Sequence, residues 1–153
     1  MIIGWREWVG LPGLGIPGIR AKVDTGAKTS ALHSFNVEHV EKDGEPYARF
    51  LVHPHQQSDD LVMRCEAKII DQRPVRDSGG HVEDRYVIET VFEIAGQSCP
   101  LEITLTNRND MMFRMLLGRS ALVEAGITVN PELSYACGDA PENLDALLKE
   151  RSV

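Results

Sequence analysis

The stretch Val23-Asp24-Thr25-Gly26-Ala27 decides how this chain of 153 residues is interpreted. It brings a carboxylate, Asp24, to the end of an apolar strand and into a tight turn, where Gly26 permits close approach of the backbone. Thr25 adds a hydroxyl that can hydrogen-bond to a neighbouring loop. An isolated Asp-Thr-Gly is also typical of a surface turn whose aspartate bonds its own backbone. A second element of the sequence must therefore decide between a surface turn and a reactive one.

The strand that leads into this turn belongs to a chain with a mostly β pattern. Ile19, Ala21 and Val23 alternate with charged residues, so one face of the strand is expected to be buried and the other exposed. The same kind of signal predicts strands over residues 37–40, 47–52, 61–70, 86–94 and 101–105. The last two are expected to form a hairpin around Gly96-Gln97.

Two short helices are expected in the last third of the chain. Ser120 is the expected N-cap of a helix that ends before Gly126. A second helix is expected over Pro141–Arg151, with a proline in its first turn and leucines along one face.

Length and composition limit the classes of protein that the chain can represent. Its length argues for one domain over residues 1–153, whose last part, residues 131–153, is a C-terminal extension with the second short helix. A formal charge of −7 argues against nucleic-acid and anionic-membrane partners. The longest uncharged stretch has only 12 residues and contains prolines and glycines, so it cannot span a bilayer. Three separated cysteines and charges near the N-terminus favour a cytoplasmic protein.

The second element that the Asp24 turn requires lies near residue 118. Met115-Leu116-Leu117-Gly118-Arg119 is an apolar strand that ends in Gly-Arg and leads into the first expected helix. With these two motifs in this order, the sequence resembles the retropepsins, which are single-lobe aspartic proteases. The resemblance extends over roughly residues 16–125 and implies a mainly β fold that forms a closed β-barrel with one or two short helices. It implies that Asp24 is catalytic, with Thr25, Gly26 and Ala27 in support and Gly118 and Arg119 as a structural motif.

Two longer stretches are similar to one bacterial family. Residues 3–12 and residues 21–33 resemble the RimB-like proteins, which are associated with a ligase that adds glutamates to a ribosomal protein. Members of that family often carry the label ATP-dependent zinc protease. The residues support neither half of the label, because Gly26-Ala-Lys28-Thr29 lacks the first glycine of a P-loop and the chain has no HExxH pair. His53-Pro-His55 could supply two zinc ligands, but a third is missing from the pattern. We therefore expect no cofactor and no metal.

The mechanism that the resemblance implies needs two carboxylates that share one proton. The chain contains a single Asp-Thr-Gly, and neither Asp110 nor Asp139 has the same neighbours. The resemblance therefore implies a homodimer that pairs Asp24 with its symmetry mate. Thr25 would brace the two turns against each other, and Gly26 would offer backbone groups to the substrate.

The polar segment Gln72–Arg85 is expected to be a long connection between two strands, and it is the candidate flap. Its positive residues suggest an acidic or glutamate-rich peptide as the ligand, although nearby acidic residues make a solvated loop without a role the simpler interpretation. The candidate flap residues are Arg73, Arg76, Gly79, Gly80 and Arg85.

One position departs from the retropepsin pattern. Viral retropepsins commonly have an acidic residue where this chain has Lys28, and that residue pairs with the arginine of Gly-Arg. Arg119 must therefore find another partner, and the simplest expectation is a buried structural arginine. The sequence predicts an aspartic endopeptidase that acts on a peptide or protein. A peptide-binding module without catalysis and a zinc-dependent hydrolase remain the alternatives.

Overall fold

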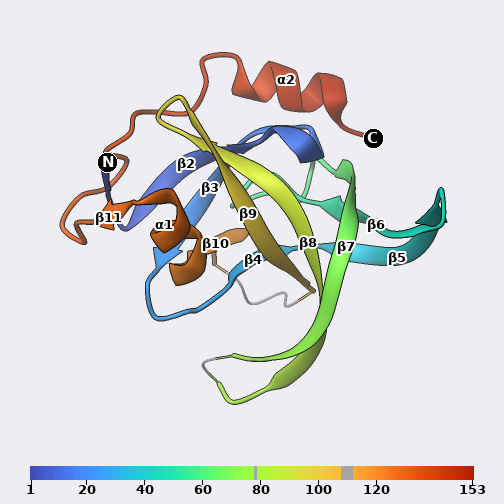
Figure 1. Cartoon of the computed structure of the whole chain (residues 1–153). Helices are drawn as coiled ribbons and strands as arrows, with labels where there is room; N and C mark the ends of the chain where they lie inside the picture. The colour runs from blue at the N-terminus through green and yellow to red at the C-terminus, as the bar shows by residue number, and fades with distance from the viewer. Residues whose placement is uncertain (78, 108–111) are drawn as a thin grey trace.

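The computed structural model of the chain describes residues 1–77, 79–107 and 112–153 (Figure 1). The chain is mainly β, as the sequence predicts. The strands are β1 (Ile2–Ile3), β2 (Arg6–Leu11), β3 (Ile16–Asp24), β4 (Ser30–His33), β5 (Phe35–Lys42), β6 (Glu45–Val52), β7 (Met63–Arg76), β8 (Val82–Ile94), β9 (Gln97–Thr106), β10 (Met115–Gly118) and β11 (Thr128–Val129). The helices are a 3-10 turn, η1 (Pro12–Leu14), and the α-helices α1 (Arg119–Ala125) and α2 (Leu144–Arg151).

The described strands β2 to β10 form one sheet in the order β2-β3-β10-β4-β9-β8-β7-β6-β5. A further pairing between β2 and β8 joins the first of these strands back to the sixth, so the strands form a ring. The pairing that closes this ring has a single registered pair, Gly10 with Glu93. The closed barrel of the prediction is therefore not confirmed; the fold is a ring of strands with one narrow seam.

The core lies inside this ring, because the alternating strands turn their apolar faces inward. The buried side chains of β3 and β10 include Ile19, Ala21, Met115 and Leu117, each with less than 1% of its surface exposed. Val23 is slightly more exposed but belongs to the same cluster. The alternation that predicted one buried face for residues 19–23 is confirmed.

The C-terminal extension packs back onto the ring. Leu144 and Leu148 of α2 are buried in the main core, and α2 lies along the opposite side of the molecule from the β7–β8 hairpin (Figure 1). The N-terminal segment is tied to the same extension through Glu7, which is fully buried. Its carboxylate accepts hydrogen bonds from the backbone nitrogens of Gly4, at 2.7 Å, and Ala136, at 2.9 Å.

Both helix starts differ from the prediction. The N-cap of α1 is Gly118, without a side-chain cap bond, because Arg119 is already helical. The helix ends at Gly126 in the left-handed conformation, as expected. The second helix begins at Leu144 rather than near Pro141. Within the described ranges, neither helix is long and apolar enough to span a membrane.

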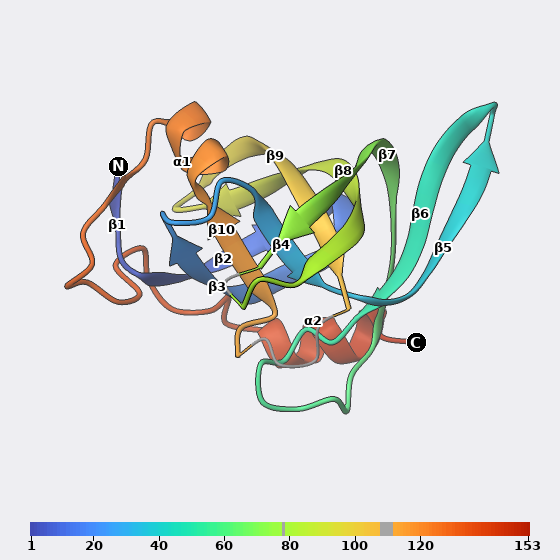
Figure 2. The ribbon, with the colours of Figure 1, turned by 90° about the horizontal axis from the view of Figure 1, so that it is seen from below.

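The segment Gln72–Arg85 is mostly strand, which corrects the expected long connection. Residues 73–76 of β7 pair in register with residues 82–85 of β8, so this segment is a hairpin arm with a short tip. We call the part of this arm from Gln72 to Arg85 the flap hairpin. A second arm, β5–β6, turns at Asp43-Gly44 and projects away from the body of the molecule (Figure 2).

Candidate active site

Asp24 stands at the last residue of β3, where the parallel pairing of β3 with β10 places it beside Gly118. The half-buried Asp24 carboxylate is held by its own turn, because its Oδ1 accepts hydrogen bonds from the backbone nitrogens of Gly26, at 3.0 Å, and Ala27, at 3.2 Å. No described residue donates to its second oxygen, Oδ2. One carboxylate oxygen therefore fixes the orientation of the group, and the other is left to interact with a ligand.

The Gly-Arg motif holds the turn that follows Asp24. A β-carbon on Gly118 would lie 2.5 Å from the carbonyl carbon of Thr29, so only glycine fits there. The amide of Gly118 donates to the Ser30 hydroxyl at 2.9 Å. These contacts fasten the beginning of α1 to the strand that leaves the turn.

Arg119 finds its partner in the turn itself. Its Nη1 donates to the backbone carbonyl of Thr25 at 2.9 Å, and its own amide donates to the carbonyl of Ala27 at 2.8 Å. Arg119 is exposed, so the expected buried arginine is wrong, although its role is structural. It needs no acidic residue at position 28, because a carbonyl oxygen takes the place of the carboxylate.

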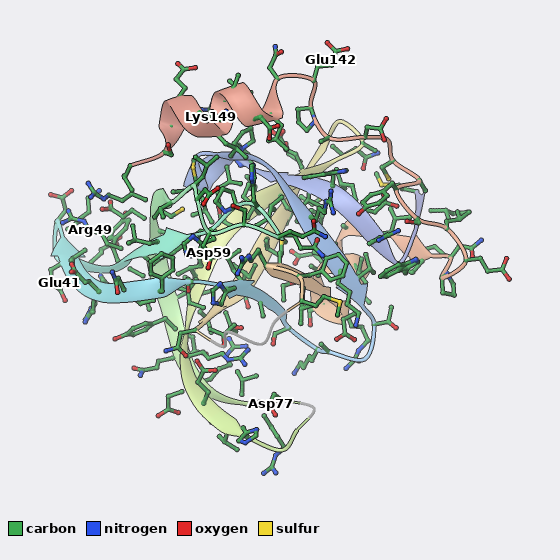
Figure 3. The ribbon with its side chains drawn as sticks, turned by 180° about the vertical axis from the view of Figure 1, so that it is seen from behind. Glu41, Arg49, Asp59, Asp77, Glu142 and Lys149 are labelled. Atoms are coloured by element: carbon green, nitrogen blue, oxygen red, sulfur yellow. The ribbon has the colours of Figure 1, made fainter. Side chains whose placement is uncertain are left out.

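A pocket of about 540 Å³ lies between the Asp24 turn and the flap hairpin. The turn and the strands below it contribute Asp24, Gly26, Ala27, Lys28, Thr29, Ala31 and Leu116, and the flap hairpin contributes Val75, Arg76, Asp77 and Arg85. Figure 3 shows Asp77 close to the tip of the hairpin. The structure therefore brings together the predicted reactive turn and the predicted flap.

The comparisons with known proteins agree with this arrangement. Residues 2–139 match the family described as retropepsin-like aspartic endopeptidase RimB. The chain belongs to the RimB-like family. The crystal structure of a protein with unknown function (DUF785) from Legionella pneumophila aligns with this chain with a TM-score of 0.77 at 27% sequence identity. The alignment covers 89% of this chain and 97% of that chain.

Curated relatives carry the same RimB-like segment within longer chains. Proteins named probable alpha-L-glutamate ligase from Shewanella halifaxensis (strain HAW-EB4) and Parasynechococcus marenigrum (strain WH8102) are 44% identical over 137 residues and 46% identical over 139 residues. The matches cover 90% and 91% of this chain but 30% of each relative. The chain thus spans less than a third of the length of these curated relatives.

The candidate flap residues of this RimB-like chain separate into two groups. Arg76 and Arg85 line the Asp24 pocket, whereas Arg73 is bound outside it to Asp71, at 3.0 Å, and to Glu102, at 3.9 Å. Gly79 and Gly80 lie at the tip of the flap hairpin and do not line the pocket.

The two arginines that line the pocket differ in whether their side chains are already hydrogen-bonded. Arg85 is buried, with Nη1 donating to Thr104 Oγ1 at 3.3 Å and Nε donating to Glu83 Oε2 at 3.2 Å. Among the described residues, the side chains of Arg76 and Lys28 have no hydrogen bond or ion pair. The pocket therefore carries two available cations beside Asp24.

Several residues of the pocket were missed by the sequence interpretation. Thr29, Ala31, Leu116 and Val75 line it, and Lys28 was noted only as a departure from the pattern. Leu116 and Ala31 are a registered pair across β10 and β4. The alternation of β10 places Leu116 on the same side as Gly118, and this was the one signal that could have identified it.

The two histidines considered as zinc ligands do not share a site. His53 Nε2 lies 3.9 Å from Asp59 Oδ1, whereas His55 Nε2 lies 3.3 Å from Asp145 Oδ1. Within residues 1–77, 79–107 and 112–153, no three His, Cys, Asp or Glu side chains are grouped to hold a metal ion. Asp110 lies outside the described residues.

Proposed function

We propose that this chain is a retropepsin-type aspartic endopeptidase in which Asp24 pairs with Asp24 of a second copy. The observation that carries the proposal is the Asp24 carboxylate at the edge of the flap-covered pocket, with Oδ1 fixed by two backbone amides and Oδ2 unbonded among the described residues. Membership of the RimB-like family supports the same assignment.

The chemistry follows from placing two such carboxylates close together. Two adjacent carboxylates cannot both ionise easily, so the pair holds one proton, as in aspartic proteases generally. The ionised member accepts a proton from a water molecule, and the resulting hydroxide attacks the carbonyl carbon of the peptide bond. The protonated member donates to the carbonyl oxygen, and a proton is delivered to the amine as the carbon–nitrogen bond breaks.

The remaining groups of the pocket have positioning roles in this proposal. Arg119 holds the Thr25 carbonyl and so fixes the turn that carries Asp24. The flap hairpin covers the peptide and keeps bulk water away, apart from the water molecule that reacts. Thr25 is exposed, which is consistent with its expected role of contacting the turn of the second copy.

An acidic peptide fits the charges of the pocket. Lys28 and Arg76 line it without partners among the described residues, in a chain whose formal charge is −7. The longer relatives are named as glutamate ligases, which supports a glutamate-rich substrate. The three cysteines are free, which supports the expectation of a cytoplasmic protein.

The test is Asp24→Asn, assayed for cleavage of a glutamate-rich peptide by mass spectrometry. The variant should fold normally and lose activity by about a hundredfold or more, because it removes the only group assigned to the proton transfers. EDTA should leave the wild-type activity unchanged. Proteolysis retained in the variant at matched stability contradicts the aspartic mechanism, and activity that EDTA removes and zinc restores supports the zinc hydrolase instead.

A second candidate function is peptide binding without cleavage. The names of the relatives favour it, because a segment covering 30% of a ligase could serve to hold an acidic chain. This candidate predicts that the wild type and Asp24→Asn bind a glutamate peptide with equal affinity and that neither cleaves it.

A further inference from the structure

A second pocket lies on the same face of the β4–β10 ladder as the Asp24 pocket. Ala31 and Leu116 are paired in register, and both line the Asp24 pocket. Two positions further along, beyond the Leu32–Met115 pair, the amide of His33 donates to the carbonyl of Arg114 at 2.8 Å. Side chains two residues apart on a strand point to the same face. His33 and Arg114 therefore continue the wall formed by Ala31 and Leu116.

This second pocket has a volume of about 790 Å³ and a basic wall. The Arg114 side chain is only 13% exposed and is fixed in place, because Nε donates to the His55 carbonyl at 3.1 Å. The buried His33 and the largely buried His53 provide two imidazoles. The full lining of the pocket is His33, Phe35, His53, Gln56, Gln57, Asp59, Met112 and Arg114.

The counter-ion of Arg114 lies on the solvent side. Arg114 Nη2 is 2.7 Å from Asp59 Oδ1, and the Asp59 side chain is 71% exposed. An exposed carboxylate that pairs with a guanidinium can exchange with another carboxylate at little cost, because water solvates it when it leaves. The guanidinium, by contrast, is held by the wall of the pocket and stays in position.

We propose that this pocket binds an acidic side chain of the peptide whose scissile bond lies at Asp24, an inference that rests on the proposed function. Gly118 is registered with Asp24, and Arg114 lies four residues earlier on the same ladder. At about 3.3 Å per strand residue, the two positions are about 13 Å apart. An extended peptide covers that distance with about four residues. The pocket is thus a subsite that selects an acidic residue at this separation.

The experiment compares the binding of short and long peptides to the Asp24→Asn protein, which prevents turnover. Fluorescence anisotropy measures the affinity of labelled α-linked glutamate peptides with three and with eight residues. The longer peptide reaches both pockets and should bind about tenfold more tightly than the shorter one, because it gains charge-assisted hydrogen bonds.

Charge variants separate the subsite from a general effect of peptide length. Met112 lines the pocket and is 79% exposed, so it accepts a polar side chain without loss of core packing. Met112→Glu should remove most of the advantage of the eight-residue peptide relative to Met112→Gln, with little effect on the three-residue peptide. Val123→Glu adds the same charge on α1, lines neither pocket, and should leave the advantage unchanged.

The outcomes distinguish this inference from the proposed function. The subsite is overturned if Met112→Glu lowers the affinity for both peptides equally. It is also overturned if Val123→Glu lowers the advantage of the longer peptide as much as Met112→Glu does. Cleavage of the eight-residue peptide by the wild type is measured separately. A wild type that binds as expected without cleaving overturns the peptidase and leaves the pocket established as a binding site.

Discussion

Gly118 shows how closely the backbone approaches itself beside Asp24. A β-carbon there would lie 2.5 Å from the Thr29 carbonyl carbon and 2.9 Å from the Ser30 amide nitrogen. These contacts are with backbone atoms, which cannot move aside as a flexible side chain can. The position of Asp24 therefore depends on the absence of a side chain in the neighbouring strand.

Gly118→Ala is expected to destabilise the protein by about 1–3 kcal/mol, because the added methyl forces β10 and the Asp24 turn apart. Urea unfolding measures this cost, and the activity should fall as well. Ser120→Ala is the control, because α1 has no side-chain cap bond and its stability should change by less than about 0.5 kcal/mol. If Gly118→Ala and Ser120→Ala are both as stable as the wild type, the contact at Gly118 is not tight.

Cys65 gives the stability a dependence on pH. Burial raises the pKa of its thiol from 9.0 to about 12. Above pH 9 the unfolded chain therefore loses a proton that the folded chain retains, so the free energy of unfolding falls as the pH rises towards 12. Between pH 9 and pH 10.5 the expected loss is about 1–2 kcal/mol.

Urea unfolding of the wild type and of Cys65→Ala over this pH range checks the expectation. The variant lacks the thiol, so its stability should decline less steeply than that of the wild type. Parallel declines would show that the thiol titrates normally in the folded protein.

At the scale of elements, the flap hairpin and the Asp24 turn each place one basic side chain that is unpaired within the described residues in the Asp24 pocket, and the hairpin carries a paired one outside it. Arg76 and Lys28 are without partners among the described residues, whereas Arg73 is bound to acidic residues outside the pocket. Replacing Arg76 and Lys28 together by glutamine should weaken the binding of a glutamate-rich peptide by about tenfold at low salt.

Arg73→Gln is the matched control, and it should change the affinity little. Anisotropy titrations at two salt concentrations measure both effects, and the double variant should also reduce the salt dependence. If Arg73→Gln weakens binding as strongly as the double variant, the positive charge acts through the whole hairpin rather than through the pocket.

The sequence predicted elements well where one face of a strand is buried. Residues 19–23 alternate because the inner face of β3 lies in the core, and the same is true of β8 near Phe92 and of β9 near Leu101. The flap hairpin was predicted as a loop because no residue in the outer half of β7 is buried. Without a buried face, no alternation marks the strand, and only the pairing with β8 reveals it.

The candidate site was predictable only where a motif marks it. Asp24 and Gly118 stand in recognisable motifs, and the parallel pairing of β3 with β10 brings them together. His33 and Arg114 belong to no motif, and their proximity depends on the register of β4 with β10. Such a register between distant segments is set by packing of the whole ring, so local sequence patterns do not contain it.

At the scale of the whole molecule, one chain supplies one Asp-Thr-Gly, so the proposed activity should require association. Specific activity is expected to rise with protein concentration as dimers form. The dimer is expected to be weak, because the acidic residue that viral retropepsins commonly have at the position of Lys28 also helps to hold their two copies together. Analytical ultracentrifugation beside a cleavage assay measures both quantities.

A strictly monomeric protein with constant specific activity would contradict the symmetric pair of carboxylates. The second acid would then have to come from the same chain. Among the described residues, Asp77 is the second carboxylate that lines the Asp24 pocket, so Asp77→Asn would be the variant to examine in that case.

The strand β8 connects two distant parts of the molecule mechanically. It begins at Val82, near the tip of the flap hairpin, and reaches Glu93, which forms the single registered pair that closes the ring. Its 13 residues extend over about 43 Å, and it is paired with β7 or β9 along that length. We therefore expect movement of the hairpin tip towards Asp24 to shift the strand at the single registered pair that closes the ring. Peptide binding under the flap hairpin is then expected to make this pair open less often, and slower deuterium uptake at Gly10 would report it.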